Sequence, residues 1–164
     1  MNFMIEIEPL FAVDTNILVH AYNNNDQEKH EKATALLIPC WEGKCRLVVS
    51  SQNLGEFFRV VTEKQKNLLP SVEAQHLITQ ICLCSDWIKL HYDYPVLLYA
   101  IQLSLKKKKA FWDTLLAATL LSSGITHLYT ENIKDFQHIP GLKVHNPFKT
   151  PSESPSNPHT GGSA

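Results

Sequence analysis

Short apolar runs alternate with longer amphipathic stretches along most of this chain. The short runs predict five strands, at residues 10–14, 46–50, 87–91, 126–130 and 142–145. Apolar residues at helical spacing predict six helices, at residues 17–22, 28–37, 51–65, 71–84, 93–105 and 111–124. Residues 39–44 are expected to form a connector and residues 131–136 a polar turn. Strands that alternate with helices in this way predict an α/β fold with a parallel sheet.

The length and composition fit one globular domain. The chain has 164 residues, of which 44% are hydrophobic and 19% are charged, enough to bury a core. Residues 10–148 are expected to form the domain, preceded by a short extension at 1–9. Residues 149–164 are rich in proline and serine, and such a composition cannot bury enough apolar surface to order itself. We therefore predict a disordered tail there.

Charge and motif spacing exclude several classes of protein. A net charge of -1 gives no global attraction to nucleic acid, so any such binding must use local patches. The N-terminal segment carries acids where a secretory signal would carry bases, and no apolar run approaches membrane-spanning length, so we expect a cytoplasmic protein. The four cysteines form no CxxC pair and are expected to be buried thiols, and the eight histidines form no HExxH motif. A dedicated zinc site is therefore disfavoured.

Acidic residues stand at structurally notable positions. Asp14 ends the first apolar run, and in a parallel sheet ligands bind beside the carboxyl ends of strands. Asp113 lies in an almost wholly apolar helix, where an unpaired carboxylate is costly to bury. Simpler roles stay open: Asp14 or Asn16 as a helix cap, Asp113 as a first-turn acid beside the helix dipole, and Glu56 as a solvated helix residue. Thr130 ends a strand as Asp14 does, although a plain turn threonine is the alternative.

Three acids in one site would require a counter-charge. Two carboxylates about 4 Å apart repel by roughly 4 kcal/mol at an effective dielectric of 20. A divalent cation removes this repulsion, and an oxygen-only donor set without a cysteine pattern favours Mg²⁺ or Mn²⁺. Such ions suit phosphodiester hydrolysis, because they activate a bound water and stabilise the charge that develops on phosphate.

Four segments together resemble the PIN-domain ribonuclease family, and most of all the VapC-type toxins of toxin–antitoxin pairs. These segments are Val13–Asn16, Ser50–Glu56, Phe111–Ala118 and Leu128–Phe136, within a likeness that extends from Phe11 to Phe148. The resemblance implies a three-layer α/β/α sandwich with a central parallel sheet of four to five strands. It also implies an acidic metal pocket and endonucleolytic cleavage of RNA.

By position, the resemblance assigns metal coordination and catalysis to Asp14, Glu56 and Asp113, with Asn16 and Thr130 as polar supports. Asn132 departs from the family pattern, because many members carry a fourth acid there, and this weakens a second metal site. Asp135 lies three residues further on and is the candidate substitute, since it would share a helical face with Asn132. Glu131 is expected to point elsewhere.

The leading hypothesis is an Mg²⁺- or Mn²⁺-dependent endoribonuclease toxin that a small VapB-type antitoxin holds inactive. The resemblance also implies a homodimer. A catalytically weakened RNA-binding or assembly module is the alternative, binding RNA through Lys106–Lys109, a run that otherwise is a solvated helix end. A phosphohydrolase with an aspartyl nucleophile is disfavoured, because Asn16 occupies the place of its usual partner acid. The sequence does not indicate which RNA is cut.

Overall fold

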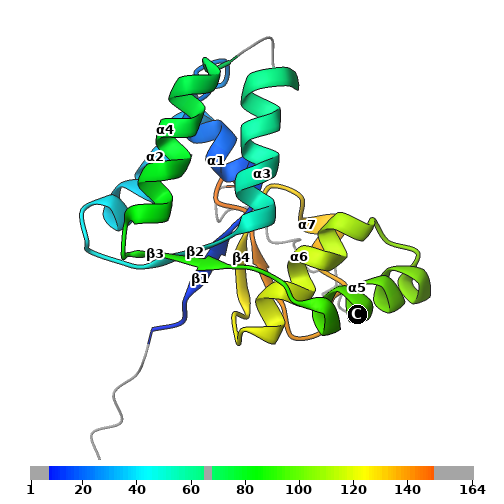
Figure 1. Cartoon of the computed structure of the whole chain (residues 1–164). Helices are drawn as coiled ribbons and strands as arrows, with labels where there is room; N and C mark the ends of the chain where they lie inside the picture. Colours follow the sequence, from blue (N-terminus) through cyan, green and yellow to red (C-terminus); the bar gives the residue numbers. More distant parts are fainter. Residues whose placement is uncertain (1–7, 65–67, 150–164) are drawn as a thin grey trace, which may run out of the picture.

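The computed structural model describes residues 8–64 and 68–149. Most of the expected N-terminal extension and nearly all of the expected disordered tail lie outside these residues. Within them, the chain forms a five-stranded parallel sheet between layers of helices (Figure 1). The predicted α/β class, the parallel sheet and the three layers are confirmed.

The order of strands in the sheet is β3-β2-β1-β4-β5. The strands are β1 (Phe11–Val13), β2 (Leu47–Ser50), β3 (Trp87–Leu90), β4 (His127–Tyr129) and β5 (Lys143–His145). The chain moves outward from β1 to β3 and then returns to place β4 on the other side of β1. The strand order therefore reverses between β1 and β4, the position at which open α/β sheets form ligand sites.

Seven helices surround the sheet in the described part of the chain. They are α1 (Thr15–Ala21), α2 (Gln27–Trp41), α3 (Ser51–Arg59), α4 (Ser71–Leu83), α5 (Tyr94–Lys107), α6 (Phe111–Ser122) and α7 (Ile133–Phe136). A π-helical turn, Val60–Lys64, continues α3. None of these helices is long and apolar enough to cross a membrane.

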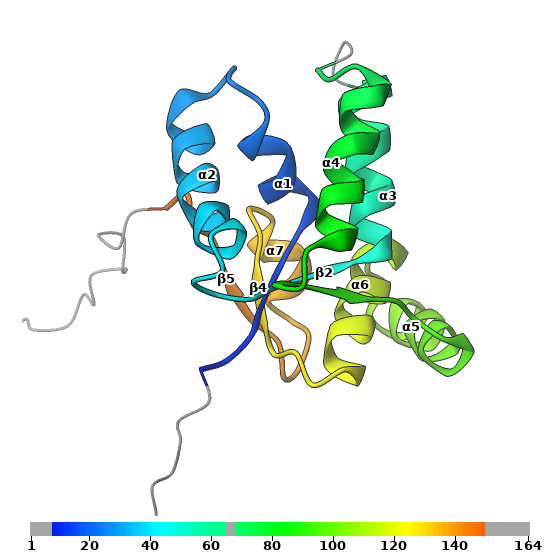
Figure 2. The same ribbon diagram turned by 60° about the vertical axis from the view of Figure 1, so that its left-hand side comes forward.

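Alternating side chains of the strands build two cores, one on each face of the sheet. Val13 and Val49 pack with α1, α2, α3 and α4, whereas Ala12, Val48 and Leu128 pack with α6 and α7. This is the period-two alternation of a strand that is buried on both faces. Figure 2 shows the two helical layers on either side of the strands, with α5 outside α6.

Three local expectations differ from the structure. α2 continues through Pro39 to Trp41, because burial of Cys40 and packing of Trp41 on Trp87 offset the backbone hydrogen bond that proline removes. The expected polar turn at residues 131–136 contains helix α7, which buries Phe136. Cys40 is buried and Cys84 is half-buried against the same core, but Cys45 and Cys82 are exposed, so the expectation of buried thiols was wrong for these two. The expected end of the third helix, at residue 65, lies outside the described residues.

Candidate active site

Asp14 lies at the carboxyl end of β1, where it also caps helix α1. Its Oδ1 accepts the backbone N–H of Thr15 at 2.7 Å, so the capping role considered above is present. Its Oδ2 accepts hydrogen bonds from Asn16 Nδ2 at 2.9 Å and from Thr130 Oγ1 at 2.7 Å. The Asn53 amide is 3.4 Å from Oδ1. Asp14 is only 7% exposed, so its orientation is fixed by four donors in a nearly closed environment.

The environment of Asp14 disfavours its charged form. Burial raises the pKa of Asp14, the hydrogen bonds from Thr130 and Thr15 lower it, and Glu56 raises it again. The net shift is upward. No lysine or arginine among the described residues forms an ion pair with this carboxylate. Asp14 is therefore a carboxyl group that hydrogen bonds orient, and no lysine or arginine of the described residues is paired with it to favour its charged form.

Glu56 reaches the same region from helix α3. The helix begins with a capping box in which Ser50 and Asn53 each bond the other's backbone N–H, and this fixes α3 at the end of β2. Glu56 Oε2 accepts from Thr15 Oγ1 at 3.1 Å, and its Oε1 accepts from Gln52 Nε2 at 3.0 Å. Thr15 thus lies between the two acids, with its backbone on Asp14 and its hydroxyl on Glu56.

Asp113 enters from the first turn of α6 and differs from the other two acids. It is half-buried, yet it has no hydrogen bond or ion pair within residues 8–64 and 68–149. Burial is the main cause that raises its pKa to about 6, followed by the charges of Asp135, Asp14 and Glu56. The helix dipole favours a first-turn acid, but here desolvation and like charge dominate. Asp113 is an unpartnered carboxylate that faces other carboxylates.

These three acids line one cavity of about 250 Å³, which we call the acidic pocket. Asp14 comes from the end of β1, Glu56 from α3 and Asp113 from α6, and Asn16 and Asn132 also line the pocket. Thr130 is buried behind it and reaches it through hydrogen bonds to Asp14 and Asn16. The structure thus brings together the three acids that were predicted from the sequence, with both polar supports.

Asp135 takes a different position from the other predicted acids. It is exposed on α7 and lines a separate small cavity beside Thr114 and His138, whereas Asn132 lines the acidic pocket. It is close enough to Asp113 to raise the pKa of that carboxyl. Asp135 therefore raises the pKa of Asp113 through its charge, although it does not line the acidic pocket.

Glu131 does not line the acidic pocket, although His20, which contacts its carboxylate, does. It forms ion pairs with Lys29 and, at 2.9 Å, with His20 Nε2. Burial acts to raise the pKa of Glu131, but the hydrogen bonds from Lys29 and His20 outweigh it and the pKa is lowered. This acid is already paired with Lys29, whereas Asp113 has no ion pair among the described residues.

Two site residues were not assigned from the sequence. Thr15 links Asp14 to Glu56, and Asn53 Nδ2 contacts both Thr15 Oγ1, at 3.2 Å, and Asp14. Both residues lie inside the segments that carried the family resemblance, one after Asp14 and one three before Glu56. Each stands in a short polar run directly after a predicted strand, where ligands of a parallel sheet bind, and that placement was the available signal.

The donor set of the acidic pocket fits a hard cation. Carboxylate, amide and hydroxyl groups line it together with His20, whose Nε2 is already engaged by Glu131, and the lone pairs of Asp113 have no protein donor among the described residues. Among the described residues, no three histidine, cysteine or acidic side chains already converge closely enough to enclose an ion. This arrangement suits Mg²⁺, which keeps several waters and contacts only one or two carboxylates directly.

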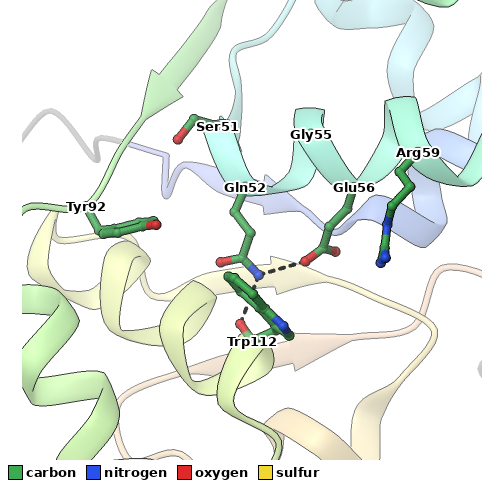
Figure 3. Close-up of a pocket in the computed structure, with 7 residues that line it drawn as sticks. All are labelled: Ser51, Gln52, Gly55, Glu56, Arg59, Tyr92 and Trp112. Carbon is green, nitrogen blue, oxygen red and sulfur yellow. Dashed lines mark hydrogen bonds between the residues drawn. The ribbon is translucent and has the colours of Figure 1, made fainter.

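Figure 3 shows the lining of a second cavity, of about 390 Å³. This cavity shares Glu56 with the acidic pocket. Gln52, Glu56 and Arg59 line it from α3, and Tyr92 and Trp112 contribute two aromatic rings. We call it the aromatic pocket. Trp112 directly precedes Asp113, so the first turn of α6 contributes to both cavities.

Comparison with known proteins identifies the family. The model of the PIN domain family matches residues 11–142, so the chain belongs to the PIN domain family. No curated protein matches the sequence.

Solved structures share the fold at low sequence identity. VapC20 from Mycobacterium tuberculosis, described as a toxin that cleaves the sarcin–ricin loop, is 19% identical with a TM-score of 0.56, covering 72% of this chain and 86% of its own. VapBC2 from Rickettsia felis, bound to a DNA fragment from its promoter, is 22% identical with a TM-score of 0.58, and the match covers 84% of this chain and 98% of that chain. DNA-bound VapBC from Salmonella typhimurium is 20% identical with a TM-score of 0.57, and the match covers 84% of this chain and 97% of that chain. These likenesses confirm the PIN-like fold.

Proposed function

We propose that this protein is an Mg²⁺- or Mn²⁺-dependent endoribonuclease that hydrolyses RNA phosphodiester bonds with water as the nucleophile. The observation that carries the proposal is the acidic pocket, in which Asp14, Glu56 and Asp113 face one cavity from three separate elements. Burial and mutual repulsion raise the pKa of Asp14 and of Asp113. Such an arrangement is unfavourable for folding and favourable for binding a cation.

Some residues of the acidic pocket would hold the cation, and others orient those residues. Asp113 and Glu56 would hold the cation, together with Asp14, whose orientation is set by Thr130, Asn16 and Thr15. When bound, such an ion supplies a water of lowered pKa and stabilises negative charge on the phosphate. Thr15 keeps Glu56 directed into the pocket through its 3.1 Å hydrogen bond. No serine or cysteine nucleophile is required.

We assign the fourth-acid role to Asp135 as an outer carboxylate. Asn132 lines the pocket where an acid would complete a second metal site, and Asp135 influences Asp113 from outside. One tightly held ion therefore fits the pocket better than two. The Asn132 amide, which stands in place of an acid, also supports the second candidate function, an RNA-binding module with weakened catalysis.

We propose further that the protein is a cytoplasmic toxin whose activity an antitoxin blocks. The support is the fold shared with the VapBC proteins named above, of which two are DNA-bound complexes. A homodimer is supported by helix α5, where Tyr94, Leu98, Ile101 and Leu105 form an exposed apolar stripe on one face. Sedimentation of wild type against Leu98→Glu tests this, and the variant is expected to be monomeric.

Cleavage of a mixed RNA pool tests the proposed activity. Wild type is incubated with structured and single-stranded RNA in Mg²⁺, in Mn²⁺ and in EDTA, with single-stranded DNA of the same sequences as a control. The expected result is RNA fragments with either ion and none in EDTA. RNA that is bound but uncut under every condition would instead support the weakened binding module. Fragments that persist in EDTA would contradict the metal-dependent mechanism.

A further inference from the structure

The aromatic pocket exposes rings that a folded protein normally covers. Trp112 is 57% exposed and Tyr92 is 37% exposed, and both line the cavity that shares Glu56 with the acidic pocket. Successive residues on a helix point about 100° apart. Asp113 therefore faces the acidic pocket while Trp112 faces the neighbouring one. An exposed indole beside a reactive site is a surface for a planar ligand.

The polar wall of this pocket has an unsatisfied acceptor. Gln52 Nε2 donates to Glu56 Oε1 and to the Trp112 carbonyl oxygen, each at 3.0 Å, and two acceptors on one atom fix the orientation of the amide. Gln52 Oε1, directed toward the Tyr92 side in Figure 3, has no donor among the described residues. A buried acceptor without a donor is costly, and a ligand N–H would satisfy it once a small shift of the Gln52 amide exposes the oxygen to the cavity.

Arg59 adds a free positive charge at the same cavity. It is exposed and lies one helical turn beyond Glu56 (Figure 3). In the part of the chain that the structure describes, Arg59 forms no ion pair and no side-chain hydrogen bond. A guanidinium with open donors favours phosphate. Planar rings, a hydrogen-bond acceptor and a phosphate-binding cation therefore meet beside the acids.

We propose that the aromatic pocket binds one unpaired RNA nucleobase, stacked on the indole of Trp112, while Arg59 contacts a neighbouring phosphate. This inference rests on the proposed nuclease function and places the nucleotide next to the bond that is cut. Bases of a duplex are stacked on each other, so the pocket selects single-stranded segments or flipped-out loop bases. Trp112 is then a substrate-binding residue and takes no part in the chemistry.

Tryptophan fluorescence reports stacking directly. The chain has three tryptophans, of which Trp87 is buried and Trp41 packs against it on the far side of the sheet from α6. Emission is titrated in EDTA, where the proposed cleavage is off, with a single-stranded RNA of roughly eight nucleotides, within the span of common single-strand sites. A chain of the same length that lacks bases is the matched ligand. Binding is measured independently by the anisotropy of labelled RNA.

Three variants separate stacking from structural effects. Trp41→Phe is the matched control and should keep both quenching and affinity. Trp112→Phe should lose the quenching but bind within about threefold of wild type, because phenylalanine retains an aromatic face. Trp112→Ala should weaken binding about 5- to 100-fold, the usual range for a lost base–aromatic stack. In cleavage assays its KM should rise by a similar factor while kcat changes little. The base-free chain should quench no variant.

The outcomes distinguish this inference from the nuclease function. If metal-dependent cleavage is found, but RNA does not quench the emission and Trp112→Ala leaves KM unchanged, the base-binding pocket is wrong and the nuclease stands. If the base-free chain binds and quenches as strongly as RNA, the pocket recognises phosphate alone and the inference fails. If wild type neither binds nor cuts RNA, both proposals fail. Thermal unfolding of each variant verifies that it is folded.

Discussion

Thr130 Oγ1 donates a 2.7 Å hydrogen bond to Asp14 Oδ2 and so joins the carboxyl ends of β4 and β1, which lie 116 residues apart in the chain. The two strands are neighbours in the sheet, with Val13 opposite Tyr129. The bond exists because the chain returns to β1 after building β2 and β3. A carboxylate held in this way is oriented before any ligand arrives, which is what a metal or phosphate site requires.

Asp14→Asn and Asp113→Asn should both abolish cleavage but should have opposite effects on stability. In Asp14→Asn an amide NH₂ replaces an oxygen that accepts hydrogen bonds, and each donor left unpaired costs about 1–3 kcal/mol. In Asp113→Asn no hydrogen bond is lost and repulsion is relieved. Urea unfolding in EDTA should therefore give a lower free energy of unfolding for the first variant and a higher one for the second. Equal destabilisation of both would mean that Asp113 has a structural partner.

The stability of the metal-free protein should fall as the pH rises from about 4 to about 6. Burial and neighbouring acids raise the pKa of Asp113 from 3.8 to about 6, so in this window the folded state holds a proton that the unfolded chain has released. The free energy of unfolding then decreases with pH, by about 1–2 kcal/mol after solvent screening. Denaturant unfolding measured in EDTA at several pH values across this range gives the slope of the free energy of unfolding against pH. Asp113→Asn should flatten it, and an unchanged slope in that variant would refute the assignment.

Substitutions of Asn132 and Asp135, the two candidates for the fourth acid, should change metal binding more than they change the stability of the fold. Asn132→Asp adds a carboxylate to the lining of the acidic pocket, so cleavage should reach half its maximum at a lower Mn²⁺ concentration. Asp135→Asn removes a charge from outside the pocket and should reduce the cleavage rate about tenfold, much less than Asp113→Asn does. Rates measured over a Mn²⁺ titration compare the two variants. A complete loss of activity in Asp135→Asn would make Asp135 a direct ligand.

Glu131→Gln should leave cleavage within about threefold of wild type, although Glu131 lies close to the site in sequence. Its carboxylate is paired with Lys29 and hydrogen-bonded to His20 Nε2, and its side chain is 31% exposed. Partly exposed ion pairs contribute at most about 1 kcal/mol, so only a small loss of stability is expected. Thermal unfolding and a cleavage assay on the same preparation measure both effects. A large loss of activity would bring Glu131 into the site.

Much of the candidate site could be predicted because its acids occupy positions with a clear physical meaning. Asp14 follows a buried strand, and Asp113 interrupts an apolar helix, so each was conspicuous in the sequence. The simpler roles considered for them are also present, since Asp14 caps α1 and Asp113 is an acid in the first turn of α6. A cap and a pocket residue can be the same carboxylate, which periodicity alone does not reveal.

Other features depended on tertiary contacts that the sequence pattern does not encode. The direction of Asp135 follows from the short helix α7, which forms because Phe136 is buried. The length of α2 follows from packing of Cys40 and Trp41, which overrides the usual effect of Pro39. Trp112 looked like part of a buried helix, and only the fold shows that its ring is exposed beside the acids.

Side-by-side cleavage by Asp113→Asn and Glu131→Gln tests the metal-dependent acidic pocket most directly. Each variant removes one carboxylate near the same sheet edge, but only Asp113 is unpaired and lines the pocket with Asp14 and Glu56. With Mn²⁺ and single-stranded RNA, wild type and Glu131→Gln should cut at similar rates, EDTA should stop both, and Asp113→Asn should not cut. Cleavage by Asp113→Asn at the wild-type rate would show that the three acids do not form the active site.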